Sequence, residues 1–129
     1  MEQPAPHPSL WLVDGFNVLC ATLLGGRDRA EWWTAARRAE VLALAERFDE
    51  PGVEIWVVFD GLRDPGESPG RRVRRVFAPS ADDWLIEQVE ARGASASLTL
   101  VTADRRVAER ARRRGAQVVS PGEFLARCG

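Results

Sequence analysis

Four short, largely apolar runs constrain the fold most, because none of them alternates regularly between apolar and polar residues. They cover residues 10–13, 55–59, 98–102 and 117–120. A strand with such a sequence is buried on both faces, which is typical of parallel sheets. The runs therefore predict a mostly parallel sheet with helices on both of its faces.

Helical patterns separate these runs. Residues 31–48, 80–92 and 104–114 carry apolar side chains at helical spacing, and a glycine follows each of the last two segments. The more polar residues 71–77 are predicted as a further strand. Alternation of strand and helix predicts an α/β fold, doubly wound with right-handed crossovers.

One domain is expected, because 129 residues allow one sizeable core. We expect it to span residues 9–129, after a disordered tail of residues 1–8 that contains three prolines. No apolar run approaches the roughly 20 residues of a membrane span, and a secretory signal pattern is missing. A cytoplasmic protein without membrane contact is predicted, and two distant cysteines predict no disulfide.

Acidic residues stand where predicted strands end. Asp14, Asp60 and Asp104 fall at or just after such ends, and Asp82 and Asp83 open a predicted helix. Sites in open α/β sheets lie at the carboxyl ends of strands, so these acids are expected to converge. Clustered carboxylates repel one another unless a cation neutralises them, and an all-oxygen set suits Mg²⁺ or Mn²⁺.

Each of these polar residues also has a plain structural explanation. Asp104 can cap the following helix, and residues 80–83 match a capping box with Asp in place of Glu or Gln. Asp14 and Asp60 each precede a glycine and can form turns. Asn17 can orient a ligand carboxylate, a water or a phosphate, or simply belong to a turn. The sequence is compatible with both the structural and the metal-binding interpretation.

Arginine supplies all eighteen basic side chains, although the net charge is only −1. The arginines cluster at residues 71–75 and 105–114. Alternation places charge on both faces of the first cluster, so that strand is expected at the sheet edge. Arg72, Arg74 and Arg105 are predicted to contact phosphates; the alternative for the edge arginines is protection against edge-to-edge aggregation.

The motifs, taken in order, resemble those of NYN domains, and of the YacP-like branch in particular. The similar segments are residues 13–19 (VDGFNVL), 57–61 (VVFDG), 80–85 (SADDWL), 100–105 (LVTADR) and 115–125. The resemblance spans residues 10–126. Ala103 stands where Ser is usual and Ser80 where Thr is usual, and the region 62–79 is shorter than in many relatives.

This resemblance implies a PIN-like, three-layer α/β/α fold and a metal-dependent ribonuclease, expected to be an endonuclease. It implies Asp14, Asp82 and Asp104 as catalytic acids that bind Mg²⁺ or Mn²⁺, with Asp60 and Asn17 supporting them. The implied partner is RNA, either structured or ribosome-associated.

Two rival functions remain to be weighed. A haloacid-dehalogenase-like phosphatase needs an aspartate two residues after the first one, where this chain has Phe16. A catalytically inactive PIN-like module that binds RNA or a protein partner would retain the acids only as helix caps. Metal binding together with turnover of RNA separates this module from a nuclease.

Overall fold

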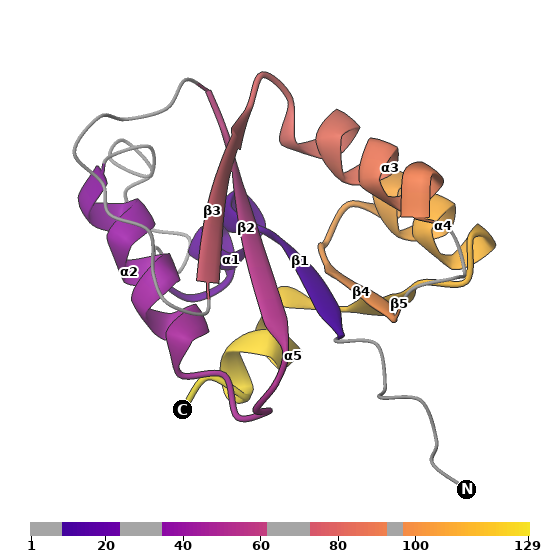
Figure 1. The fold of residues 1–129 in the computed structure, drawn as a ribbon. Helices are drawn as coiled ribbons and strands as arrows, with labels where there is room; N and C mark the ends of the chain where they lie inside the picture. Colours follow the sequence, from indigo (N-terminus) through magenta and orange to yellow (C-terminus); the bar gives the residue numbers. More distant parts are fainter. Residues whose placement is uncertain (1–8, 24–34, 62–72, 93–96) are drawn as a thin grey trace, which may run out of the picture.

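The computed structural model describes residues 9–23, 35–61, 73–92 and 97–129. Its five strands are β1 (Leu10–Asp14), β2 (Glu54–Asp60), β3 (Val73–Ala78), β4 (Leu98–Val101) and β5 (Gln117–Val119). They form one sheet in the order β3-β2-β1-β4-β5, and every neighbouring pair is parallel (Figure 1). The predicted parallel sheet is confirmed; the predicted tail, residues 1–8, lies outside the described residues.

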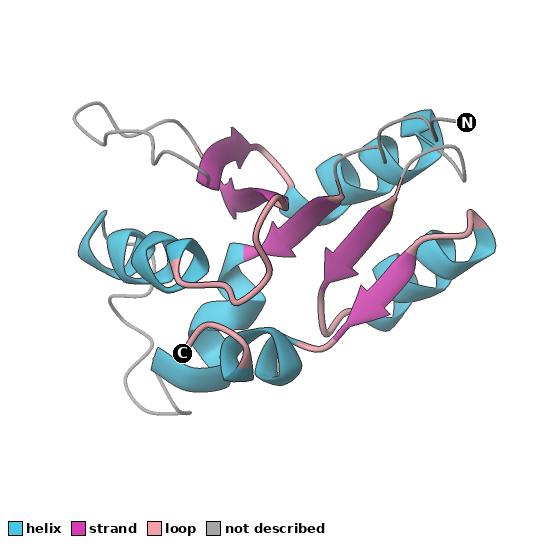
Figure 2. Ribbon diagram, turned by 60° about the horizontal axis from the view of Figure 1, so that its bottom comes forward, coloured by secondary structure: helices cyan, strands magenta, loops and turns pink. Residues whose placement is uncertain are grey.

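Helices cover both faces of this sheet. They are α1 (Gly15–Val18) with the π-helical turn η1 (Leu19–Leu23), α2 (Ala35–Glu46), α3 (Ala81–Arg92), α4 (Arg105–Arg113) and α5 (Pro121–Ala126). One core joins the sheet to α1, α2 and α5, and a second joins it to α3 and α4. Figure 2 shows the helices on either side of the strands, which confirms the predicted three-layer α/β/α arrangement.

The central strand β1 explains why the apolar runs do not alternate. All five of its residues are buried. Trp11 and Val13 belong to the core under α2 and α5, whereas Leu12 belongs to the core under α3 and α4. In the first core the Trp11 ring centroid lies 4.6 Å from that of Phe48, which lies 5.3 Å from that of Phe124. Both faces of β1 are therefore packed, as continuous apolar sequence requires.

Strand β3 lies at the edge of the sheet, as its charges predict. Arg74 is exposed, and its guanidinium lies over the ring of Trp56 on β2, 4.8 Å from the centroid. Val73 and Ala78 are buried at the two ends of the strand. The edge strand therefore packs on both cores while carrying cationic side chains, which is how natural sheets protect an edge.

The order of the strands creates a crevice beside β1. The chain runs from β1 to β2 and β3 on one side, and returns to place β4 and β5 on the other. At such a reversal the connections from the two neighbouring strands leave in opposite directions, which opens a crevice at the carboxyl ends. Asp14 ends β1 and Asp104 follows β4 by three residues, so both flank this reversal.

Candidate active site

Asp14 lies at the floor of the crevice, with 3% of its surface exposed. Its Oδ1 accepts a hydrogen bond from the backbone N–H of Asn17 (3.2 Å), so it caps α1. Burial first, and then the charges of Asp82 and Asp60, raise the pKa of Asp14 to about 6, against the backbone N–H groups of Asn17 and Phe16. The side chain thus caps α1, although burial and neighbouring charges oppose its ionisation.

Gly15 fixes where Asp14 lies. A Cβ atom at this position would overlap the ring of Phe59 on β2 and lie 3.0 Å from the carbonyl oxygen of Val58. Only a residue without a side chain lets the chain turn from β1 into α1 this close to β2. The glycine after the first acid is therefore required by packing.

Asp60 links β2 to α3. It ends β2, is exposed, and accepts a hydrogen bond through Oδ1 from the backbone N–H of Ala81 (2.8 Å). Ser80 Oγ accepts from the backbone N–H of Asp83 (3.2 Å), which is the Ser half of the predicted capping box. These two bonds hold the first turn of α3 at the rim and so bring Asp82 beside Asp60.

Asp104 caps α4, as its alternative interpretation predicted. Its Oδ1 accepts a hydrogen bond from the backbone N–H of Val107 (3.1 Å). Its own N–H donates to Oγ1 of Thr102 (3.1 Å), a buried residue that the sequence analysis did not single out. A threonine two residues before a capping aspartate is the local signal for this bond.

Asn17 connects the two sides of the crevice. Its side-chain oxygen accepts from the backbone N–H of Ala103 (2.5 Å) and from the hydroxyl of Thr102 (3.3 Å), more than 80 residues along the chain. The amide thus holds the turn before Asp104 against the end of β1. Asn17 is therefore a residue that positions Asp104.

Asp82 completes the acidic cluster, which we define as Asp14, Asp60, Asp82 and Asp104. Burial raises the pKa of Asp82 above its usual range. The charge of Asp104, a hydrogen bond shared with its carboxyl group, and the charge of Asp60 raise this pKa as well, whereas the charge of Arg106 lowers it. Among the described residues, no three acidic, histidine or cysteine side chains already stand close enough to hold one ion. The acids are therefore neighbours that repel one another, not a closed cage.

The sequence matches the family model of the YacP-like NYN domain over residues 11–128. The chain belongs to the YacP-like NYN family. Two solved structures of Rae1 (YacP) from Bacillus subtilis resemble this NYN domain. For one, the TM-score is 0.72 at 23% identity, over 93% of this chain and 73% of that one. For a tryptophan-to-leucine variant, it is 0.71 at 23% identity, over 93% and 74%.

The family is nuclease-like, and the likeness to Rae1 concerns the fold. No curated protein matches the sequence. None of the helices in the described part of this NYN domain is both long and apolar enough to cross a membrane.

The predicted phosphate-binding arginines of the NYN domain lie at different distances from the acidic cluster. Trp56, which lies under Arg74, pairs with it in register and precedes Asp60 by four residues. Because a strand rises about 3.3 Å per residue, Arg74 starts about 13 Å from the acids. The structure thus does not bring Arg74 to the acidic cluster, and Arg72 lies outside the described residues. Arg105, in contrast, is exposed and directly follows Asp104.

A pocket of about 400 Å³ begins at Asp104. We call it the α4 groove and define it by its polar lining residues Thr102, Asp104, Arg105, Glu109, Arg112, Ser120 and Glu123. It lies between α4 and the end of β5 with the start of α5, on the side of the crevice away from β3. The groove therefore adjoins the acidic cluster directly.

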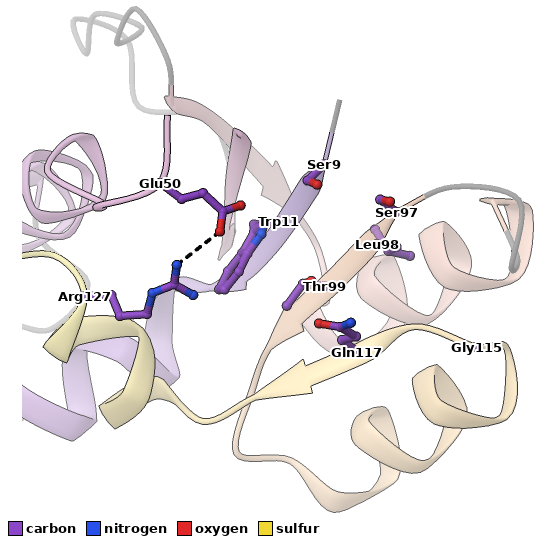
Figure 3. A pocket seen from close by; sticks show the side chains of 9 residues that line it. All are labelled: Ser9, Trp11, Glu50, Ser97, Leu98, Thr99, Gly115, Gln117 and Arg127. Carbon is purple, nitrogen blue, oxygen red and sulfur yellow. Dashed lines mark hydrogen bonds and ion pairs between the residues drawn. The ribbon is translucent and has the colours of Figure 1, made fainter. Parts of the chain in front are cut away.

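A second pocket, of about 350 Å³, lies at the opposite ends of the strands of the NYN domain (Figure 3). Trp11 and Thr99 line it, and an ion pair of 3.2 Å between Arg127 and Glu50 closes one side. None of the four clustered acids lines it. This pocket is therefore not part of the candidate active site.

Proposed function

We propose that this NYN domain is a metal-dependent endoribonuclease that hydrolyses RNA phosphodiester bonds at the acidic cluster. The observation that carries the proposal is the convergence of four carboxylates from four separate segments at one crevice. One of them is buried, and burial together with their mutual repulsion raises the pKa values of Asp14 and Asp82. Perturbed carboxyl groups in a crevice are typical of functional sites.

The donor chemistry of the cluster fits a hard divalent cation. Its side chains offer only carboxylate oxygens, which Mg²⁺ and Mn²⁺ prefer. Their mutual repulsion is the cost that a bound cation would remove. Asp14, Asp82 and Asp104 would hold the ion. When bound, it supplies Lewis-acid activation of water and neutralises charge at the phosphate.

The remaining residues of the site position these acids. Asp60 holds the first turn of α3, and Asn17 holds the turn before Asp104. In the proposed reaction, water attacks phosphorus and the bond to the 3′ oxygen breaks, leaving a 5′-phosphate and a 3′-hydroxyl. We expect structured or ribosome-associated RNA in the cytoplasm as the substrate, as the family resemblance implies.

A cleavage assay tests this proposal. Total RNA is incubated with the protein in EDTA, Mg²⁺ or Mn²⁺, and the product ends are mapped. We expect internal cuts with 5′-phosphates only with metal, and none from Asp14→Asn or Asp82→Asn. The matched control is Asp83→Asn, since Asp83 lies in the same helical turn with 71% of its side chain exposed. Undiminished cleavage by Asp14→Asn would contradict the proposal.

A second candidate function is a non-catalytic RNA-binding or partner-binding module. The observation in its favour is that Asp14, Asp60 and Asp104 each accept a hydrogen bond from a backbone N–H. Helix capping alone would then give these acids a purpose. The module predicts RNA or partner binding without any metal-dependent product.

A further inference from the structure

Five of the six arginines between residues 105 and 114 lie on two faces of α4. On the face toward α3, Arg110 and Arg114 form ion pairs with Glu90 (3.3 and 2.9 Å). Arg106 lies 4.0 Å from Asp83, also on α3. Two carboxylates therefore offset most of the charge of these three arginines, and the pairs link α3 to α4.

The other face carries Arg105 and Arg112, which both line the α4 groove and are exposed. Neither forms an ion pair with a carboxylate in the described part of the chain. They are seven residues apart, which is about 10 Å along the helix axis at about 1.5 Å per residue. This spacing is large enough for each arginine to bind a separate phosphate.

We propose that a single RNA strand runs from the acidic cluster into the α4 groove, where Arg105 and Arg112 each bind one phosphate; this inference rests on the proposed function. The volume of the groove, about 400 Å³, is in the lower range of small-ligand sites and accommodates about one nucleotide. A double helix is too wide to enter it. The substrate of the site is thus single-stranded where it is bound.

Arg105 is the cation of the α4 groove that adjoins the acidic cluster. The acidic cluster repels an RNA backbone, and Arg105 is adjacent to Asp104 in the sequence, so it offsets that repulsion where the strand leaves the site. Arg74 is farther away and lies on Trp56. Glu109 lies between the two groove arginines in sequence and Glu123 of α5 also lines the groove, so phosphates are confined to the two arginines and not spread along the helix.

Binding measured without metal tests the path independently of cleavage. The probe is a short fluorescein-labelled oligouridine strand, followed by anisotropy in EDTA over a series of KCl concentrations. The groove variant is Arg105→Gln with Arg112→Gln. The matched control is Arg110→Gln with Arg114→Gln, which removes the same charge from the opposite face of the same helix. Melting curves verify that both variants fold.

We expect the groove variant to bind more weakly and to lose about 1.4 from the slope of log Kd against log salt, or about 0.7 per phosphate contact. The control should keep the slope of the parent, and Glu109→Gln should bind more tightly. A labelled hairpin duplex should bind more weakly than the single strand.

The path would be overturned if the groove and control variants lost RNA affinity equally. It would also be overturned if the groove variant bound RNA like the parent, or if the parent did not bind RNA. If the binding results are as expected but the parent cuts no RNA with Mn²⁺, the proposed function fails and the path stands.

Discussion

Replacing Asp14 by Asn should stabilise the protein at neutral pH. Asp14 has 3% of its surface exposed, and its pKa is raised from 3.8 to about 6. The shift is about two units, and each unit corresponds to about 1.4 kcal/mol, so ionised Asp14 costs the native state about 3 kcal/mol. Asn has no charge and still offers Oδ1 to cap α1.

The stability gained by Asp14→Asn is smaller than the full electrostatic cost of ionised Asp14. The ionised carboxyl group of Asp14 also accepts from the backbone N–H of Phe16, and the neutral amide oxygen of Asn is a weaker acceptor. That loss offsets about 1 kcal/mol, which leaves a net gain of about 2 kcal/mol in the free energy of unfolding.

The pH dependence follows from the sign of the shift. The native state binds the Asp14 proton more tightly than the unfolded chain, so the stabilisation from protonation is fully present below 3.8. It is lost as the pH rises through about 6, the native pKa. The Asn variant should therefore have a higher free energy of unfolding than the parent at pH 7.5. This difference should vanish or reverse near pH 3.5.

Urea unfolding followed by tryptophan fluorescence measures this difference. Both proteins are unfolded in EDTA at several pH values between 3.5 and 7.5, so that no cation masks the repulsion. Asp83→Asn serves as the control and should follow the stability of the parent throughout. A variant that is less stable at pH 7.5, or a difference that does not change with pH, would refute this account of Asp14.

Three further predictions concern the same site. Millimolar Mg²⁺ or Mn²⁺ should raise the melting temperature by several degrees through mass action, and Asp82→Asn should blunt that rise; unmoved melting curves would show that the acids bind no cation. Gly15→Ala should lower the free energy of unfolding by about 1–3 kcal/mol and reduce cleavage, since the Cβ overlaps Phe59; an unchanged urea midpoint would contradict the packing argument. Thr102→Val should cost about 1–3 kcal/mol and lower kcat, because two partly buried hydrogen bonds are lost; parental urea curves and kinetics would remove Thr102 from the site.

Much of the fold could be predicted because burial leaves a clear signature in the sequence. Strands packed on both faces have continuous apolar sequence, and β1, β2 and β4 follow that rule. The arginines of β3 identified the edge of the sheet, since charge on both faces excludes a central position. The position of the acids followed from the parallel sheet itself, because all carboxyl ends of parallel strands lie at one edge.

Contacts between distant segments could not be predicted. The bond from Asn17 to the turn before Asp104 joins residues 86 apart, and no local pattern specifies it. The same holds for Arg74, whose position over Trp56 depends on the register between β2 and β3. A one-residue change in register would turn that side chain to the other face, so the distance of Arg74 from the acids could not be read from the sequence, and phosphate binding by Arg74 stays a prediction.

Helix capping does not by itself account for Asp14. Asn caps a helix about as well as Asp and carries no charge, so a protein that needed only the cap would be more stable with Asn. The chain instead carries a carboxylate whose ionisation is opposed by burial, by Asp82 and by Asp60. That cost is typical of residues whose charge serves a function. If Asp14→Asn proves more stable yet inactive, the charge exists for chemistry and the nuclease is favoured; if it is more stable and still binds RNA with no metal-dependent cleavage in the parent, the non-catalytic module is favoured.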